Sequence, residues 1–201
     1  LVLNFNSKKI NKIKNPKYIL GGKGANLAIM KGMGLPVPAG FIISTEVCEL
    51  FNKNKKKLPK KVLKNIELEL KIIEKLTNKK FGDLKKPLLI SVRSGARVSM
   101  PGMMDTILNL GLNDQTVKAL SEKTLNGRFA KDSYRRFIQM YGDVVLNIDR
   151  HLFEGMIDNQ KLNKGVLLDT ELEENDWDEL IYKFKELVKK KTKKEFPQDV
   201  Q

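Results

Sequence analysis

The chain has 201 residues, a formal net charge of +14 and 41% hydrophobic residues. This length allows one domain or two small ones and is enough to bury a hydrophobic core. No apolar run approaches the roughly eighteen residues that a membrane-spanning helix requires, and the apolar stretch at 1–5 is too short for a signal peptide. Because the chain begins with Leu1 rather than Met, we expect a processed, trimmed or partial polypeptide.

The excess positive charge first suggests a nucleic-acid or membrane-surface protein. However, the lysines occur in short runs beside predicted helices and loops, such as 53–57 and 189–191, without arginine-rich clusters and with few aromatic residues between them. We interpret most of them as solvated surface, expect no membrane partner and disfavour nucleic acid. The positive field would still attract an anionic nucleotide.

The single cysteine, Cys48, excludes an internal disulfide and a zinc site built from cysteines. A reducing cytoplasm is the simplest compartment for such a chain. Cys48 lies in a predicted early helix, where we expect a buried structural thiol rather than a nucleophile.

The first part of the chain mixes short strands with helices. Apolar residues three or four positions apart, such as Val62, Ile66 and Leu70, predict a strong amphipathic helix. In chain order we predict a strand at 1–5, a glycine turn at 21–24, a helix at 25–33, a strand at 41–43, a helix beginning at 44 or 45, a helix over 58–77 and a strand over 87–90.

From Asn113 onward the pattern becomes helical. We predict helices from 113 or 114 through 120, over 128–145, around 153–157 and over 171–191. The whole chain is therefore predicted to have an α+β fold, with an α/β subdomain over 1–112 and a helical subdomain over 113–201.

The glycine turn at 21–24 opens a helix, and the amides and positive end of a helix favour an anion. Lys23 adds a mobile positive charge there. A purely structural turn is the alternative, and the spacing is not that of a Walker loop.

A stronger signal lies in the loop that follows the strand predicted at 87–90. Arg93 and Arg97 are four positions apart among small residues, and Gly95 and Gly102 give the loop backbone freedom. Arginine side chains of this kind can neutralise transferring phosphates, although surface salt bridges are the alternative role. Asp105 could bind a cation, but capping the next turn is the commoner role.

His151 is the only histidine of the chain. A single histidine offers no histidine-based metal cluster and no charge relay, so we expect a non-catalytic role. We predict no metal site within the chain.

Three segments resemble the pyruvate, phosphate dikinase family. Residues 20–27 with 34–41 are similar to the nucleotide-domain opening that this family shares with phosphoenolpyruvate synthase and the glucan dikinases. Residues 129–141 are also similar to the family, and the likeness runs from about residue 20 to residue 197. The sharpest motif is Ser91-Val92-Arg93-Ser94-Gly95-Ala96-Arg97 with 99–111, which favours the phosphate-dependent dikinases over the synthase.

The resemblance implies the amino-terminal part of an ATP-grasp nucleotide-binding domain. In such enzymes ATP phosphorylates phosphate and a swivelling histidine, and the phosphohistidine converts pyruvate to phosphoenolpyruvate, with AMP and diphosphate as the other products. By motif match, Lys23 and Arg93 would contact the ATP phosphates, and Gly102 would belong to the loop that closes over them. Arg97 is a weaker assignment. Arg93 is the only residue for which the resemblance implies a part in catalysis.

The same resemblance implies that much of the enzyme lies outside this chain. The Mg²⁺ ligands, the second half of the ATP-grasp domain, the phosphohistidine domain and the pyruvate-binding barrel are expected elsewhere in a full-length homodimer. His151 is not in the Thr-Ser-His context of the phosphoryl carrier. The alternative interpretation is a catalytically inactive truncated fragment that acts as a basic RNA- or protein-binding module.

Overall fold

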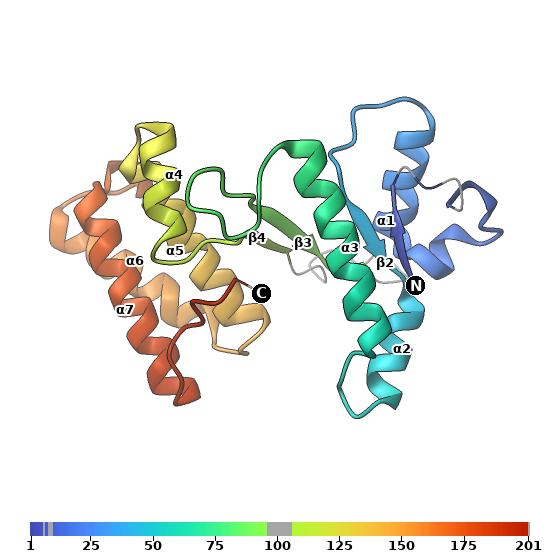
Figure 1. Cartoon of the computed structure of the whole chain (residues 1–201). Coiled ribbons are helices and arrows are strands. Elements are labelled where there is room, and N and C mark those ends of the chain that lie inside the picture. Colours follow the sequence, from blue (N-terminus) through green and yellow to red (C-terminus); the bar gives the residue numbers. More distant parts are fainter. Residues whose placement is uncertain (6, 8–9, 96–105, 201) are drawn as a thin grey trace. The chain divides into compact units, whose positions relative to one another are not determined.

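The computed structural model describes residues 1–5, 7, 10–95 and 106–200. The chain forms two compact units, each described by itself below (Figure 1). Unit 1 comprises Leu1–Asn78 with Ser94–Met104, and unit 2 comprises Lys79–Arg93 with Asp105–Gln201. These units differ in extent from the predicted domains, 1–112 and 113–201, and that domain division stays a prediction.

The predicted α+β class is confirmed. Within the described ranges there are seven α-helices and two separate two-stranded antiparallel sheets. No helix in this part of the chain is both long and apolar enough to cross a membrane.

Unit 1 is built on one small sheet and three helices. Strand β1 (Val2–Asn4) pairs with β2 (Phe41–Ile43), with Leu3 opposite Ile42. The helices are α1 (Pro16–Gly32), α2 (Thr45–Lys53) and α3 (Lys60–Thr77), preceded by a 3₁₀ turn at Ile10–Lys12. A small buried cluster holds them together, formed by Ile10, Leu20, Ala28 and Ile42 with the half-buried Leu3, Phe5, Ile13 and Ile19.

The predicted glycine turn at 21–24 is wrong in its extent. Helical structure begins earlier, at Pro16, whose fixed φ suits the first position of a helix. Only Gly21 departs from helical geometry inside α1, with φ 71° and ψ 165°. The break divides α1 into two helical stretches, and Lys23 lies in the second, just after the break.

Unit 2 contains the longer helices. Strand β3 (Ile90–Arg93) pairs with β4 (Thr106–Leu110), and the helices are α4 (Thr116–Thr124), α5 (Gly127–Val144), α6 (Arg150–Lys164) and α7 (Glu174–Thr192), with a 3₁₀ turn at Asp169–Glu171. Helix α5 packs on α4, α7 and β4. The core is larger than that of unit 1 and includes the fully buried Tyr134, Ile138, Phe153, Trp177, Leu180 and Phe184.

Side-chain caps mark two of these helix starts. The Asn126 side chain accepts a hydrogen bond from the Phe129 amide at the start of α5, and the Asp149 side chain accepts one from the His151 amide at the start of α6. Helix α6 ends at Gly165 in a left-handed conformation. It is therefore much longer than the helix predicted around 153–157.

The strand predicted over 87–90 is displaced by three residues, to 90–93. Arg93 therefore lies at the end of a strand rather than in a loop, and it pairs with Thr106 of β4. Strand β4 is not among the predicted elements, although its Thr-Ile-Leu-Asn-Leu sequence carries the β-branched and apolar residues that strands favour.

Three buried features stabilise unit 2. The Arg135 guanidinium lies 4.5 Å from the centre of the Trp177 ring and pairs with Asp132, and burial lowers the pKa of Arg135. Asp176 accepts hydrogen bonds from Lys164 at 2.9 Å and from Gln160 at 3.2 Å.

Burial by itself would raise the pKa of Asp176, but Lys164, the Glu173 amide and Gln160 together lower it.

The third buried feature is Phe196, which follows α7. Its ring packs edge-on against Tyr134, Phe137 and Tyr141, at centroid distances of 5.6–6.4 Å.

Candidate nucleotide site

The break in α1 meets the segment that follows β3. A Cβ atom placed on Gly21 would lie 2.9 Å from the Gly95 carbonyl oxygen and 3.2 Å from its carbonyl carbon. Both residues belong to unit 1, although 74 positions separate them in sequence. Two of the segments predicted to bind phosphate therefore touch, backbone to backbone, at a place where a side chain does not fit.

Lys23 lies two residues after this break, in the second stretch of α1. Its side chain is partly exposed, and no carboxylate among the described residues forms an ion pair with it. Gly24 beside it is buried against Ile42 of β2, which fixes the start of this stretch on the small core. Lys23 is therefore a charge on a fixed backbone, available to an anion.

Arg93 lies at the last position of β3 and is exposed. It has no ion-pair partner within the described part of the chain, so the surface salt bridge considered as its alternative role is not formed with those residues. Ser94 and Gly95 follow it directly. Arg93 is grouped with unit 2 and Lys23 with unit 1, so each is described only in its own surroundings.

Two further predicted residues, Arg97 and Gly102, lie outside the described residues, as does Asp105. The assignment of Arg97 and Gly102 to the ATP phosphates stays a prediction.

The described residues offer no group of three or more His, Cys, Asp or Glu side chains that could hold a metal ion. His151 is exposed on α6 and lies 3.3 Å from a Glu154 oxygen. The expectation of a buried thiol at Cys48 is wrong, because Val47 takes the inward position of α2 and leaves Cys48 exposed.

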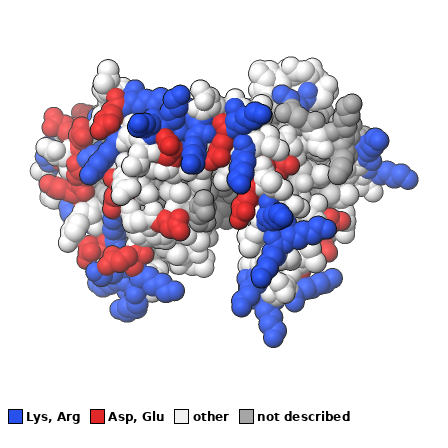
Figure 2. Space-filling model, in the orientation of Figure 1, with Lys and Arg blue, Asp and Glu red and all other residues white. Residues whose placement is uncertain are grey.

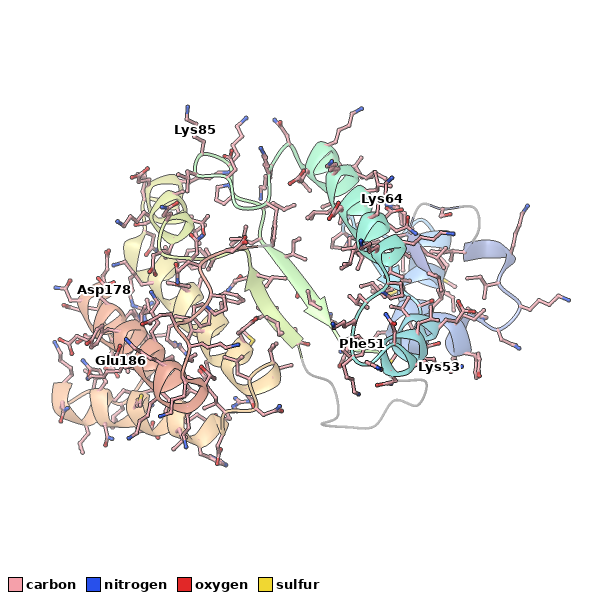
Figure 3. All side chains as sticks on the ribbon, turned by 60° about the horizontal axis from the view of Figure 1, so that its bottom comes forward. Phe51, Lys53, Lys64, Lys85, Asp178 and Glu186 are labelled. Carbon is pink, nitrogen blue, oxygen red and sulfur yellow. The ribbon has the colours of Figure 1, made fainter. Side chains whose placement is uncertain are left out.

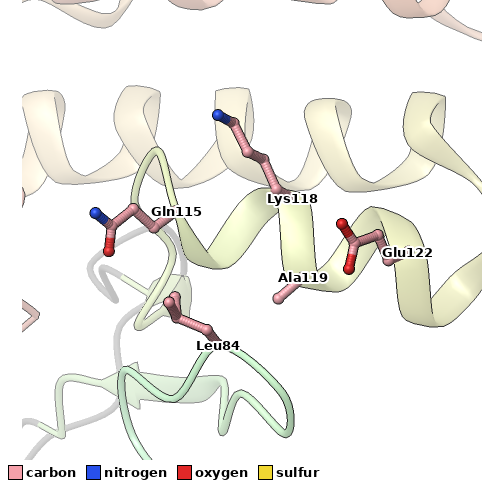
Figure 4. Close-up of a pocket in the computed structure, with 5 residues that line it drawn as sticks. All are labelled: Leu84, Gln115, Lys118, Ala119 and Glu122. Atoms are coloured by element: carbon pink, nitrogen blue, oxygen red, sulfur yellow. The ribbon is translucent and has the colours of Figure 1, made fainter.

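Two hollows occur elsewhere on the described surface. One, of about 260 Å³, lies in unit 2 between Leu84 and one side of α4, where Gln115, Lys118, Ala119 and Glu122 line it (Figure 4). The other lies in unit 1 around Asn15–Tyr18, at the start of α1. Neither is lined by Lys23 or Arg93, and each is open to solvent without a convergent set of charged groups.

Comparison with known proteins shows which sequences this part of the chain resembles. Residues 17–67 match the family model described as "Pyruvate phosphate dikinase, AMP/ATP-binding domain". This match includes Gly21 and Lys23. The chain is 51% identical over 183 residues to "Pyruvate, phosphate dikinase" of Entamoeba histolytica and 52% identical over 184 residues to that of Clostridium symbiosum.

The chain is similar to the pyruvate, phosphate dikinases over most of its own length. Both alignments cover 91% of the chain but only 21% of the relative. A chloroplastic dikinase of Flaveria pringlei is 49% identical, over 92% of the chain and 19% of its own length. The chain thus spans about a fifth of the length of the curated relatives that it matches. The resemblance predicted from 91–111, from 20–27 with 34–41 and from 129–141 is confirmed.

Sequence reasoning missed the role of Gly95. It treated this residue as a source of loop freedom, whereas the structure places its carbonyl against Gly21. A single sequence contains no signal for this contact, because neither glycine has a side chain whose periodicity or charge could indicate a partner.

Proposed function

We propose that the chain is the amino-terminal part of the ATP-grasp nucleotide-binding domain of a cytoplasmic pyruvate, phosphate dikinase. The observation that carries this proposal is the match to an AMP/ATP-binding domain that begins at residue 17 and so includes the helix break and Lys23. The identity of about 50% to dikinases over nine-tenths of the chain supports it.

Lys23 and Arg93 act on the phosphates of ATP. Lys23 supplies a point charge at the start of a helical stretch, where backbone amides and the helix dipole also favour an anion. Arg93 supplies a planar guanidinium that can donate two parallel hydrogen bonds to phosphate oxygens. Both charges stabilise the negative charge that spreads over the transferring phosphoryl group.

The complete reaction converts ATP, phosphate and pyruvate to AMP, diphosphate and phosphoenolpyruvate. It proceeds through a phosphohistidine on a domain outside this chain. Mg²⁺, bound by residues elsewhere, would supply charge neutralisation to the phosphates. The chain alone is expected to be inactive and to bind ATP weakly, because positioning and metal binding require both halves of the domain.

The first test is ATP binding by the 201-residue chain, measured by calorimetry at physiological ionic strength. We expect weak binding, which Lys23→Ala and Arg93→Ala each reduce further. Lys31→Ala, in the same helix, and Arg150→Ala, on the surface of α6, are matched controls that should leave it unchanged. Submicromolar affinity of the chain alone would contradict the half-site model.

The second test uses the full-length polypeptide that contains the chain. Arg93→Ala should lower ATP-dependent turnover by about 100- to 1,000-fold, as the loss of one transition-state donor does in other enzymes. Unchanged turnover would remove Arg93 from the site. Equal losses in Arg93→Ala and Arg150→Ala would indicate a general effect of charge or folding.

A further inference from the structure

Helix α3 carries lysines along its solvent side. At 100° per residue, Lys60, Lys64, Lys71 and Lys75 fall within an arc of about 60°, opposite the buried Val62 and Ile73. All four are exposed, and together they are called the lysine face. The linear sequence hides this face, because its members are four, seven and four positions apart.

A row of exposed apolar side chains runs beside the lysine face. Leu68, Ile72 and Leu76 are spaced four residues apart on α3 and are 50%, 44% and 59% exposed. Three large apolar side chains in line on one helix are unusual on a surface that covers no partner. This apolar row lies between the lysine face and the side of α3 that packs on unit 1.

The connection from α2 to α3 adds further charge at the start of the helix. Lys53, Lys55, Lys56 and Lys57, called the lysine loop, are all exposed. Lys55 and Lys56 adopt left-handed conformations, with φ 51° and 60°, which residues other than glycine and asparagine adopt at a cost.

No described carboxylate forms an ion pair with any lysine of the face or the loop. Lys56 instead donates a hydrogen bond to Asn52 and lies 5.6 Å from the centre of the Phe51 ring. Figure 2 shows basic side chains gathered at the lower right, over the part of unit 1 that holds α2 and α3, and Figure 3 labels Phe51, Lys53 and Lys64 there. Glu67 and Glu74 of α3 are the nearest acidic residues along the helix.

We propose that α3 is a docking surface for an anionic lipid bilayer, with its apolar row in the interface and its lysine face and lysine loop over the headgroups. Lysine supplies compact charges that need no fixed geometry, which suits a fluid layer of phosphates. The chain has no arginine before Arg93, so this surface lacks the residue that most often reads bases.

The apolar row discriminates between partners. A bilayer interface has an apolar phase for Leu68, Ile72 and Leu76, whereas a nucleic acid backbone would leave them in water. An 18-residue helix is about 27 Å long, so a planar surface can reach every lysine along it. This proposal departs from the prediction of no membrane partner. That prediction rests on the distribution of lysine along the linear sequence, whereas the proposal rests on the spacing of lysine around a helix.

The test is sedimentation of the 201-residue chain with vesicles of phosphatidylcholine alone or with about 30% phosphatidylglycerol. We expect binding only to the anionic vesicles. Replacing Lys60, Lys64, Lys71 and Lys75 together by Gln should weaken it by roughly 100- to 1,000-fold, since each lysine near such a surface contributes a factor of about five. Gln has nearly the helix propensity of Lys, so α3 should persist, which circular dichroism checks.

The matched control replaces Lys118, Lys123, Lys190 and Lys191 of α4 and α7 by Gln, which removes the same charge from exposed positions. If this control weakens vesicle binding as much as the α3 variant does, net charge explains the binding and the proposal is overturned. Binding to a single-stranded RNA without binding to anionic vesicles would overturn it in favour of nucleic acid.

A second variant tests the apolar row separately. Leu68→Gln, Ile72→Gln and Leu76→Gln together should abolish the part of vesicle binding that persists in about 0.5 M salt, where electrostatic attraction is screened. If the salt-resistant part is unchanged, the apolar row does not enter the interface. Lys23 and Arg93 are intact in every variant, so failure here leaves the proposed nucleotide binding untouched.

Discussion

Replacing Gly21 by Ala should loosen unit 1 through two separate costs. The backbone of Gly21, at φ 71° and ψ 165°, lies in a region that is essentially restricted to glycine, and another residue there costs about 1–3 kcal/mol. The added Cβ would also lie 2.9 Å from the Gly95 carbonyl oxygen. Relieving that contact by a backbone shift costs about 1 kcal/mol more.

The sum predicts a loss of about 2–4 kcal/mol in the free energy that protects α1 from opening. Unit 1 has only a small buried core, so a loss of this size is a large part of its stability. Native-state hydrogen exchange, followed by mass spectrometry of peptides that cover 16–32, measures this free energy directly. Peptides from α7, in the other unit, provide an internal reference.

Gly32→Ala is the matched control. Gly32 is the last residue of the same helix, and no atom would lie within 4 Å of its added Cβ. Its replacement should leave protection unchanged or raise it by up to about 1 kcal/mol. If Gly21→Ala protects 16–32 as well as the parent chain does, the glycine requirement and the close approach to Gly95 would both be refuted.

Two further predictions concern unit 2. Phe196→Ala should destabilise it by about 3–5 kcal/mol, because the ring is buried among three aromatic residues. As a control, Tyr182→Ala should change stability by less than about 0.5 kcal/mol, because Tyr182 is 67% exposed on α7. Calorimetry measures both changes, and equal effects would exclude a specific role for the Phe196 ring. Because the folded-state pKa of Asp176 lies below 3.8, its stabilisation is present above that unfolded value and is lost as the pH falls through the folded value. The temperature at the midpoint of thermal unfolding should therefore decrease as the pH is lowered below about 4. The decrease should be smaller in Asp176→Asn, and an equal decrease in both proteins would show that other groups cause it.

The helices were predicted best where their apolar spacing is regular. The amphipathic pattern of 58–77 corresponds to α3, and those of 128–145 and 171–191 correspond to α5 and α7 within a few residues. Helix α6 is longer than predicted because its second half, 158–164, has few apolar residues and is held by its cap at Gly165 and by Gln160, which is buried in the Asp176 network.

Pairing over long distances could not be predicted in the same way. Strand β4 pairs Thr106 and Ile107 with Arg93 and Val92, and although its composition is typical of a strand, the sequence does not show which segment it pairs with. At the candidate site, Lys23 and Arg93 were predicted from residue type and resemblance. The contact between Gly21 and Gly95 depends on the absence of side chains and left no pattern in the sequence.

The burial of Trp177 has a practical consequence. It is the only tryptophan of the chain, it is fully buried in unit 2, and a guanidinium lies over its ring. Intrinsic indole fluorescence therefore reports the unfolding of unit 2 and does not report the unfolding of unit 1. A denaturation curve recorded by emission alone would describe only one of the two units. Far-ultraviolet dichroism sees helices of both units, and a gap between the two curves would measure how independently the units unfold.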